Sequence, residues 1–309
     1  MPKATSRSAS HWRCAADDDE RGGGRAGGQP RRASEHSGIR RWVPAGAPGS
    51  MSRQELGPGH LWVQEGGSGE PTLLLLHGLG ASGEVWAGVR DLLDQRWPGR
   101  WVIPDLRGHG RSGHAPSYSF GGYAADVATC FKAGERVLVL GHSMGGVVGL
   151  SLASGWFGGS VVGVTGIGIK VSWTTAELAR MADLAQRPIR WFGSREEAAA
   201  WFLRQAGLDG LVPLAGELAA SGIVEVGGRW RLAADPATLA VGAPEMSGLL
   251  AAAKAPVRLA CGESDGLVTV AELRRFDPDA VQLSGLGHNA HVEDPERVLR
   301  LAEADGAGT

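Results

Sequence analysis

Short apolar segments alternate with segments of helical spacing along residues 60–172, and the alternation resumes after residue 255. The apolar runs are too short for helices and are bounded by glycine or polar residues, as expected of strands buried on both faces. Strands are predicted at 60–65, 72–76, 101–103, 137–140, 161–169, 257–261 and 280–283, and helices at 84–96, 118–132, 144–157 and 295–304. This alternation predicts an α/β fold with a doubly wound, mostly parallel sheet.

The alternation stops between residues 173 and 254. This stretch reads as mostly helical, with helices predicted at 176–186, 194–205, 211–220 and 235–253. An insertion in such a sheet is expected to lie over the strand ends as a helical cap. We therefore predict an α/β core formed by residues 51–172 and 255–309, and a cap formed by residues 173–254. Its aromatic residues are expected to fill the cap's own core rather than to line a pocket.

Residues 1–50 have a different composition, rich in Arg, Gly and Ser and nearly free of aliphatic side chains. Such a segment buries too little apolar surface to offset its chain entropy, so we predict a disordered N-terminal extension. It has no apolar segment of the kind that a secretory signal requires. A simple hypothesis is that Met51 is the true start of the protein.

One stretch carries the strongest chemical signal. The apolar run 137–140 leads into Gly141-His142-Ser143-Met144-Gly145, after which small and apolar residues continue. A chain that turns sharply from a strand into a helix needs glycines on either side of the turn, and it exposes the central side chain. The pattern predicts a nucleophile elbow with Ser143 as the nucleophile.

A serine hydroxyl needs a base, and the base needs a carboxylate to orient it. On such an elbow the partners follow in the order serine, acid, histidine. Only His288 and His291 come after Ser143; His288, in a glycine-flanked loop after the last strand, is the first choice and His291 the second. The acid is expected at a strand end, where Asp265 is preferred and Glu263 is the alternative.

An oxyanion also needs hydrogen-bond donors that are already in place. One should be the backbone N–H of Met144, at the start of the elbow helix. The second should be the backbone N–H of Leu79, in the loop that follows the strand 72–76. The predicted site therefore consists of Ser143, Asp265 and His288 with the amides of Leu79 and Met144.

The sequence resembles the α/β-hydrolase fold family across roughly residues 55–305, because it carries five short motifs in the order and at the spacing of that family. The resemblance implies that residues 105–112 shape a loop beside the site, and that His77 and His142 are structural. A serine at the elbow argues against the dehalogenases and epoxide hydrolases of the family, which carry aspartate there. The motifs are His77-Gly78-Leu79-Gly80, the loop 105–112, the elbow around Ser143, Gly262-Glu263-Ser264-Asp265 and Gly287-His288.

These residues predict a serine hydrolase that cleaves a carboxylic ester, or a related acyl bond, of a small hydrophobic substrate through an acyl-enzyme. Two alternatives stay open: a carbon–carbon bond hydrolase acting on a diketone-like substrate, and a non-catalytic ligand-binding member of the fold. No cofactor and no metal are implied. The expected partner is a small-molecule substrate.

Composition bears on the partners and the cellular location of the predicted hydrolase. The net charge of −2 gives no reason to expect nucleic acid as a partner. No apolar run is long enough for a membrane span. The three cysteines, Cys14, Cys130 and Cys261, are far apart and odd in number, which fits a reducing, cytoplasmic location. The sequence does not specify the oligomeric state.

Overall fold

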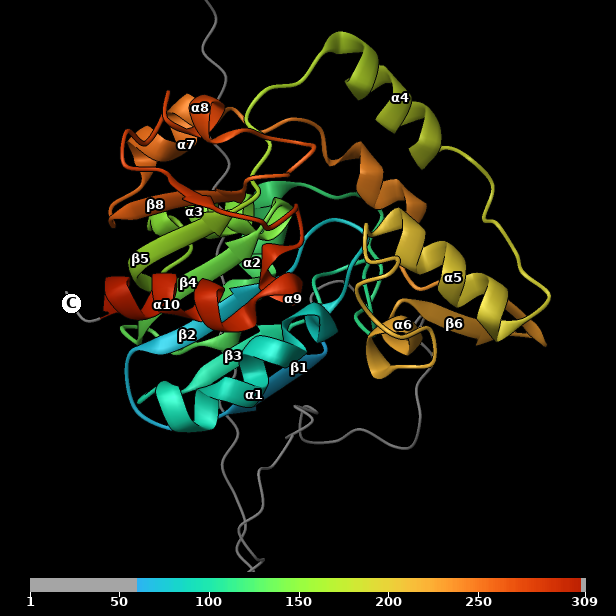
Figure 1. The fold of residues 1–309 in the computed structure, drawn as a ribbon, viewed down its shortest axis with the longest axis horizontal. Coiled ribbons are helices and arrows are strands. Elements are labelled where there is room, and N and C mark those ends of the chain that lie inside the picture. Colours follow the sequence, from blue (N-terminus) through green and yellow to red (C-terminus); the bar gives the residue numbers. More distant parts are fainter. Residues whose placement is uncertain (1–59, 307–309) are drawn as a thin grey trace, which may run out of the picture. The chain divides into compact units, whose positions relative to one another are not determined.

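The computed structural model describes residues 60–306 (Figure 1). The predicted extension at residues 1–50, the proposed start at Met51 and Cys14 lie outside the described residues. None of the described helices combines the length and the apolar character needed to cross a membrane. Cys130 and Cys261 are free thiols.

A seven-stranded sheet forms the centre of the described chain, and it confirms the predicted α/β class. The strand order is β1-β3-β2-β4-β5-β8-β9, with β1 antiparallel to β3 and every other neighbouring pair parallel. The strands are β1 (Val63–Gly66), β2 (Thr72–Leu76), β3 (Trp101–Pro104), β4 (Arg136–His142), β5 (Ser160–Ile167), β8 (Val257–Gly262) and β9 (Val281–Leu283).

Helices cover both faces of this sheet, because successive residues of a buried strand point to opposite sides. Leu73 and Leu75 of β2 pack with the helices of one face, whereas Leu74 and Leu76 pack with those of the other. The first face carries α1 (Ala87–Arg96), α9 (Ala290–Glu293) and α10 (Pro295–Gly306); the second carries α2 (Phe120–Val127), α3 (Met144–Ala153) and α7 (Met246–Ala252).

Residues 168–256, between β5 and β8, form an inserted segment that we call the insertion. Figure 1 shows α4 and α5 of this segment beside the sheet, in yellow-green and yellow. Its elements are α4 (Thr175–Ala185), α5 (Arg195–Gln205), α6 (Glu217–Ser221), β6 (Ile223–Val226), β7 (Arg229–Leu232), the 3-10 helix η3 (Pro236–Val241) and α7.

The expectation that this stretch is mostly helical was wrong for residues 223–232 and in part for residues 235–253. Residues 223–232 form an antiparallel hairpin, β6 and β7, closed by Gly227 and Gly228. Both glycines have positive φ, 59° and 76°, as a tight hairpin turn requires. The predicted helix at 235–253 is also divided, because Gly242 adopts a φ of 82° between η3 and α7.

Most aromatic residues of the insertion are core residues, as expected, but the core is shared with helices of the sheet rather than being the insertion's own. Phe192 and Phe202 are buried in the same apolar cluster that contains α1 and α10, and Trp201 and Trp230 pack against it. Trp173 is the exception, since it lines the hollow described below. The part of the insertion from α5 to β7 therefore shares its core with the first face of the sheet, whereas α7 packs on the second.

Candidate active site

The turn from β4 into α3 exposes Ser143 at the carboxyl end of the strand. Ser143 has a φ of 49°, and it is the only non-glycine residue with positive φ among residues 60–306. A Cβ on Gly141 would lie 2.6 Å from the carbonyl oxygen of Gly145, and one on Gly145 would lie 2.3 Å from that of Leu76. Only glycine fits on either side of the serine, as the sequence pattern predicts.

The loop after β2 lies directly against the elbow. A Cβ on Gly78 would come within 3.3 Å of the Ser143 Cβ, so the backbone of this loop touches the serine. Within residues 60–306, neither the Leu79 amide nor the Met144 amide donates to a protein acceptor. Met144 begins a ten-residue helix, whose N-terminal amides favour negative charge. The two amides predicted as oxyanion donors are therefore unengaged.

His77 holds this loop from behind. Its Nε2 accepts a 2.8 Å hydrogen bond from the Leu106 N–H, so Nδ1 carries the proton and donates to the Gly78 carbonyl, also at 2.8 Å. That carbonyl belongs to the same planar peptide group as the Leu79 N–H, and the two point in opposite directions. The neutral His77 ring therefore fixes the direction of the Leu79 amide.

The structure brings His288 and Asp265 together from loops 23 residues apart. His288 Nδ1 lies 2.9 Å from Asp265 Oδ2. The other oxygen, Oδ1, accepts the N–H groups of Leu267 at 2.8 Å and Val268 at 3.4 Å. The Asp265 side chain is inaccessible to solvent, whereas that of His288 is 22% exposed on the side of the hollow.

The two alternatives, His291 and Glu263, lie elsewhere. His291 is fully buried against the Trp86 ring, and neither of its nitrogens has a hydrogen-bond partner among the described residues. Glu263 Oε2 accepts hydrogen bonds from Ser284 Oγ and the Gly285 N–H at the turn after β9. The geometry thus favours His288 and Asp265.

Burial keeps several histidines around the site uncharged. It lowers the pKa of His77 to about 4 and that of His291 to about 3. Burial likewise lowers the pKa of His142 well below its usual value, and the neighbouring His291 and His288 add to the effect. The His288 side chain, by contrast, is partly exposed and lines the hollow.

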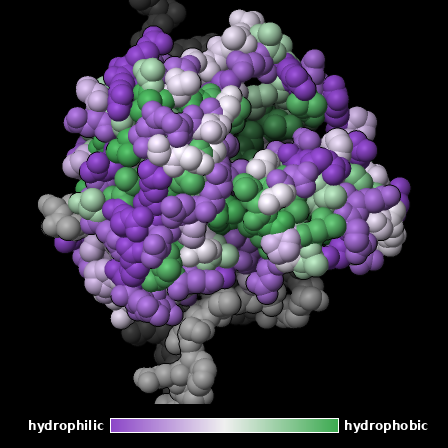
Figure 2. All heavy atoms as spheres, viewed as in Figure 1, coloured by the Kyte–Doolittle hydropathy of each residue, from purple (hydrophilic) through white to green (hydrophobic). Residues whose placement is uncertain are grey.

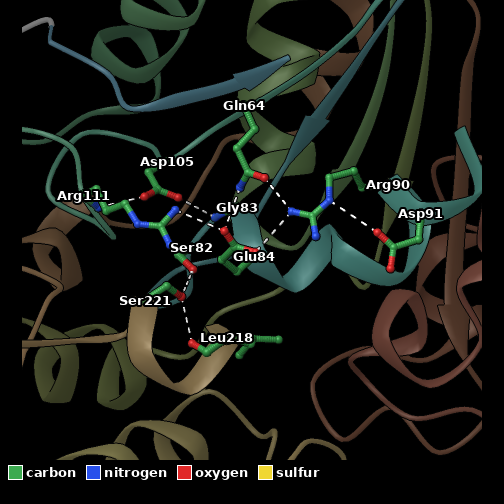
Figure 3. Close-up of polar contacts among 10 residues, drawn as sticks. All are labelled: Gln64, Ser82, Gly83, Glu84, Arg90, Asp91, Asp105, Arg111, Leu218 and Ser221. Atoms are coloured by element: carbon green, nitrogen blue, oxygen red, sulfur yellow. Dashed lines mark hydrogen bonds and ion pairs between the residues drawn. The ribbon is translucent and has the colours of Figure 1, made fainter. Parts of the chain in front are cut away.

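A buried polar network lies behind the loop 77–83 (Figure 3). Asp105 Oδ1 accepts the Gly83 N–H and Oδ2 accepts the Arg111 N–H, both at 2.7 Å. Glu84 pairs with Arg90 at 3.3 Å and with Arg111 at 3.1 Å. The loop 105–112 thus acts as the inner support of the loop that carries Leu79.

The same network reaches the insertion through two hydroxyl groups. Ser221 Oγ donates to the Leu218 carbonyl at 2.8 Å, and it lies 2.6 Å from Ser82 Oγ. Because the Ser221 proton is already used, Ser82 is the donor between the two. Figure 3 shows this chain of contacts running from the loop to the α6 helix.

A hollow of about 820 Å³ opens at Ser143 and His288. Figure 2 shows it beside α4, with a hydrophobic interior and a hydrophilic rim. Its apolar lining comes from the core and from the insertion, including Met144, Val147, Ile169, Trp173, Met181 and Leu184.

Two residues at the site were missed from the sequence. Gly168 adopts a φ of 63°, and a Cβ there would lie 3.1 Å from the His288 ring and 3.2 Å from Asp265 Oδ2. Asn289 Nδ2 donates to the carbonyls of Ala206 and Gly207 at the end of α5. Gly168 directly follows the observed strand β5 but lies inside the strand predicted at 161–169, so the sequence pattern did not mark it, and nothing in the sequence links Asn289 to α5.

Residues 73–301 match the model of the alpha/beta hydrolase family, and the chain belongs to that family. The fold class and the resemblance inferred from the motifs are thereby confirmed.

Curated relatives match over part of the chain. The magnesium-chelatase 30 kDa subunit of Rhodobacter capsulatus is 37% identical over 123 residues, which are 37% of this chain and 42% of that protein. Protein phosphatase methylesterase 1 of Bos taurus is 31% identical over 157 residues, 48% of this chain and 41% of that protein. The chain spans less than half the length of these relatives.

Solved structures match over most of the described chain. An E-2-(acetamidomethylene)succinate hydrolase has a TM-score of 0.66 and 26% identity, covering 81% of this chain and 95% of that one. An esterase of Mycobacterium tuberculosis has a TM-score of 0.63 and 21% identity, covering 88% and 92%. The second likeness shows the fold alone. Family and relatives together support a hydrolase of the α/β fold.

Proposed function

We propose that the protein is a serine hydrolase that cleaves a carboxylic ester, or a related acyl bond, through an acyl-enzyme. The observation that carries this proposal is the His288 Nδ1–Asp265 Oδ2 contact of 2.9 Å beside an elbow that presents Ser143 to the same hollow. A buried carboxylate on one ring nitrogen leaves the other nitrogen to accept a proton, which is the arrangement that activates a serine.

The reaction begins when Ser143 Oγ attacks the acyl carbonyl and His288 Nε2 takes its proton. Asp265 keeps the imidazole in the required tautomer and stabilises the imidazolium that forms. The amides of Leu79 and Met144 donate to the oxyanion, where removal of one such donor typically costs about 10²–10³ in rate. His288 then protonates the leaving alcohol. In the second half, His288 activates a water that releases the acid from Ser143.

The hollow favours an uncharged, largely apolar substrate of small to medium size. Its volume of about 820 Å³ lies within the range of roughly 300–1,000 Å³ typical of small-molecule sites. The charged lining residues balance: Lys170, Arg180 and Arg204 against Glu177, Asp209 and Glu293. Lys170 is moreover paired with Glu177 at 2.5 Å. The hollow therefore offers no net charge to select an ionic substrate.

The decisive experiment labels the protein with a fluorophosphonate probe and locates the adduct by mass spectrometry. We expect an adduct on Ser143 that largely disappears in His288→Ala, because the serine then lacks its base. His291→Phe, which keeps a ring at that buried position, is the matched control and should still label. Absence of an adduct on Ser143 in the folded wild-type protein would refute the proposal and favour a ligand-binding member of the fold.

A panel of substrates then separates the enzymatic alternatives. p-Nitrophenyl esters of increasing acyl length, measured beside a vinylogous diketone, report which bond is cleaved. We expect the esters to have the higher kcat/KM. A higher value for the diketone would instead favour carbon–carbon bond hydrolysis.

A further inference from the structure

We propose that His142, next to the nucleophile, is a positioning residue that holds the main chain of the base. His142 Nε2 lies 2.9 Å from the carbonyl oxygen of His288, across 146 residues of sequence. The inference rests on the proposed function only for its effect on turnover, since the contact itself is a feature of the fold.

The direction of this hydrogen bond follows from its partners. A carbonyl oxygen can only accept, so Nε2 of His142 carries the proton and the ring is the neutral Nε2–H tautomer. Burial keeps the ring uncharged, as its lowered pKa indicates. Among residues 60–306, no other hydrogen-bond donor reaches the His288 carbonyl. Among the described residues, His142 is therefore the one group that hydrogen-bonds the main-chain carbonyl of His288.

The ring of His142 is itself held in place on several sides. It packs against the His288 ring with the centroids 4.6 Å apart, and against the His291 ring at 4.3 Å. A Cβ on Gly78 would lie 2.9 Å from its Nδ1, so the loop that carries Leu79 covers a further side. His291 in turn rests on the buried Trp86 ring, 4.5 Å away.

These contacts place His142 between the three parts of the proposed site. Its own backbone precedes Ser143, its ring borders the oxyanion loop, and its N–H fixes the loop of the base. Asp265 orients the His288 side chain, but a carboxylate on Nδ1 leaves the ring free to pivot about that contact. The bond from His142 removes this freedom at the main chain, and small misplacements of a catalytic group are costly.

Two substitutions separate the hydrogen bond from the shape of the ring. His142→Phe keeps an aromatic ring but has no donor, whereas His142→Gln places an amide N–H at a similar reach. We expect kcat for an ester to fall about 10–100-fold in the Phe variant, with KM changed less than about twofold. The Gln variant should recover kcat to within about threefold of wild type. If the Phe variant does not fold, His142→Met provides a second side chain without a donor.

A spectroscopic measurement tests the same idea without turnover. The proton shared by His288 Nδ1 and Asp265 gives a low-field proton NMR signal, assigned by its loss in Asp265→Asn. We expect a sharp signal in wild type and in the Gln variant, and a broadened or missing one in the variants without a donor.

The outcomes distinguish the two proposals. If the wild type hydrolyses no ester but the NMR signal depends on the donor at position 142, the proposed function is refuted and the role of His142 is supported. If the wild type hydrolyses esters and the Phe variant has the same kcat, the proposed role of His142 is wrong. It is also wrong if the Phe and Gln variants lose kcat equally.

Discussion

The strand ends that carry the proposed chemistry and the insertion that borders the same hollow are held by different forces. Each site residue of the core sits where a buried strand ends, and backbone or carboxylate hydrogen bonds fix it. In the insertion, by contrast, α4 has no buried residue at all. Its half-buried face, which includes Met181 and Leu184, borders the hollow.

This difference indicates a division of labour. Rigid, desolvated strand ends suit groups that must be aligned within a fraction of an ångström, whereas a helix with few buried contacts opens at low free-energy cost. The insertion is nevertheless tied to the site at two points, through Ser221 to Ser82 and through the carbonyls of Ala206 and Gly207 to Asn289. We therefore expect substitutions in the core to affect the rate of chemistry and those in α4 to affect access.

The largest effect is expected at the carboxylate of the core. Asp265→Asn should lower kcat by about 10⁴-fold, because the amide favours the wrong tautomer of the imidazole. Glu263→Gln is the matched control, since its carboxylate bonds only the turn after β9, and it should leave kcat unchanged. Steady-state kinetics on one ester measure both variants. A greater loss in the Glu263 variant would reverse the assignment of the acid.

Acid should destabilise the core much more than the insertion. The buried rings of His77, His109, His142 and His291 all lie outside residues 168–256, and burial lowers the pKa of each, to about 4 for His77 and about 3 for His109 and His291. The native state therefore binds fewer protons than the unfolded chain below pH 6.5, so stability is full above that pH and is lost as the pH falls.

The expected loss is about 1 kcal/mol per histidine between pH 6.5 and pH 5.5, or up to about 4 kcal/mol in total. Urea unfolding at pH 7.5, 6.5 and 5.5 measures it. His291→Phe removes one of the four histidines that take up a proton on unfolding in acid. It should therefore reduce the pH dependence of the free energy of unfolding by about a quarter. A stability that stays constant down to pH 5.5 would contradict the neutral, buried state of these rings.

A smaller effect on stability is expected from the hydrogen bond between Ser82 of the core and Ser221 of the insertion. In a double-mutant cycle of Ser82→Ala and Ser221→Ala, we expect a coupling free energy of about 1 kcal/mol in urea unfolding. The bond is buried, so removing the Ser221 hydroxyl deprives Ser82 of this acceptor, whereas Ser221 keeps its bond to the Leu218 carbonyl when Ser82 is changed. Additive losses would mean that the two hydroxyls do not stabilise each other.

The comparison also explains what could be predicted from the sequence. Ser143, Asp265 and His288 could be proposed together because strand ends converge in a parallel sheet, so local patterns indicate which side chains lie near one another. The hairpin at 223–232 was missed although its Gly227-Gly228 pair, between residues of high β propensity, is a usual hairpin signal. Helical spacing in the residues on either side of this pair favours a helix instead.

Other features depend on contacts that no local pattern contains. Asn289 meets α5 across more than 80 residues, and Ser82 meets Ser221 across 139. Each pairing follows from how the insertion packs on the sheet, which depends on the shape of the shared core around Phe202. The residues of the proposed site could thus be predicted along the chain, whereas their connections to the insertion could not.

The smallest effect is expected at two helix N-termini that share the same capping motif. Thr174 caps α4 and Thr269 caps α8 (Val270–Leu273), and each forms a capping box with the glutamate three residues on. Loss of such a cap costs about 1 kcal/mol. Leu273 of α8 is buried in the core, whereas α4 has no buried residue to hold its start.

We therefore expect Thr174→Ala to speed amide exchange in α4 about fivefold, which is the local equivalent of about 1 kcal/mol, and to raise KM slightly while kcat stays unchanged. Thr269→Ala should instead lower the free energy of global unfolding by about the same amount, because α8 opens only with the core. Hydrogen–deuterium exchange and urea unfolding of both variants measure this contrast. Equal exchange behaviour at the two helices would mean that α4 is as firmly held as the core, and the division between chemistry and access would then have no basis in local stability.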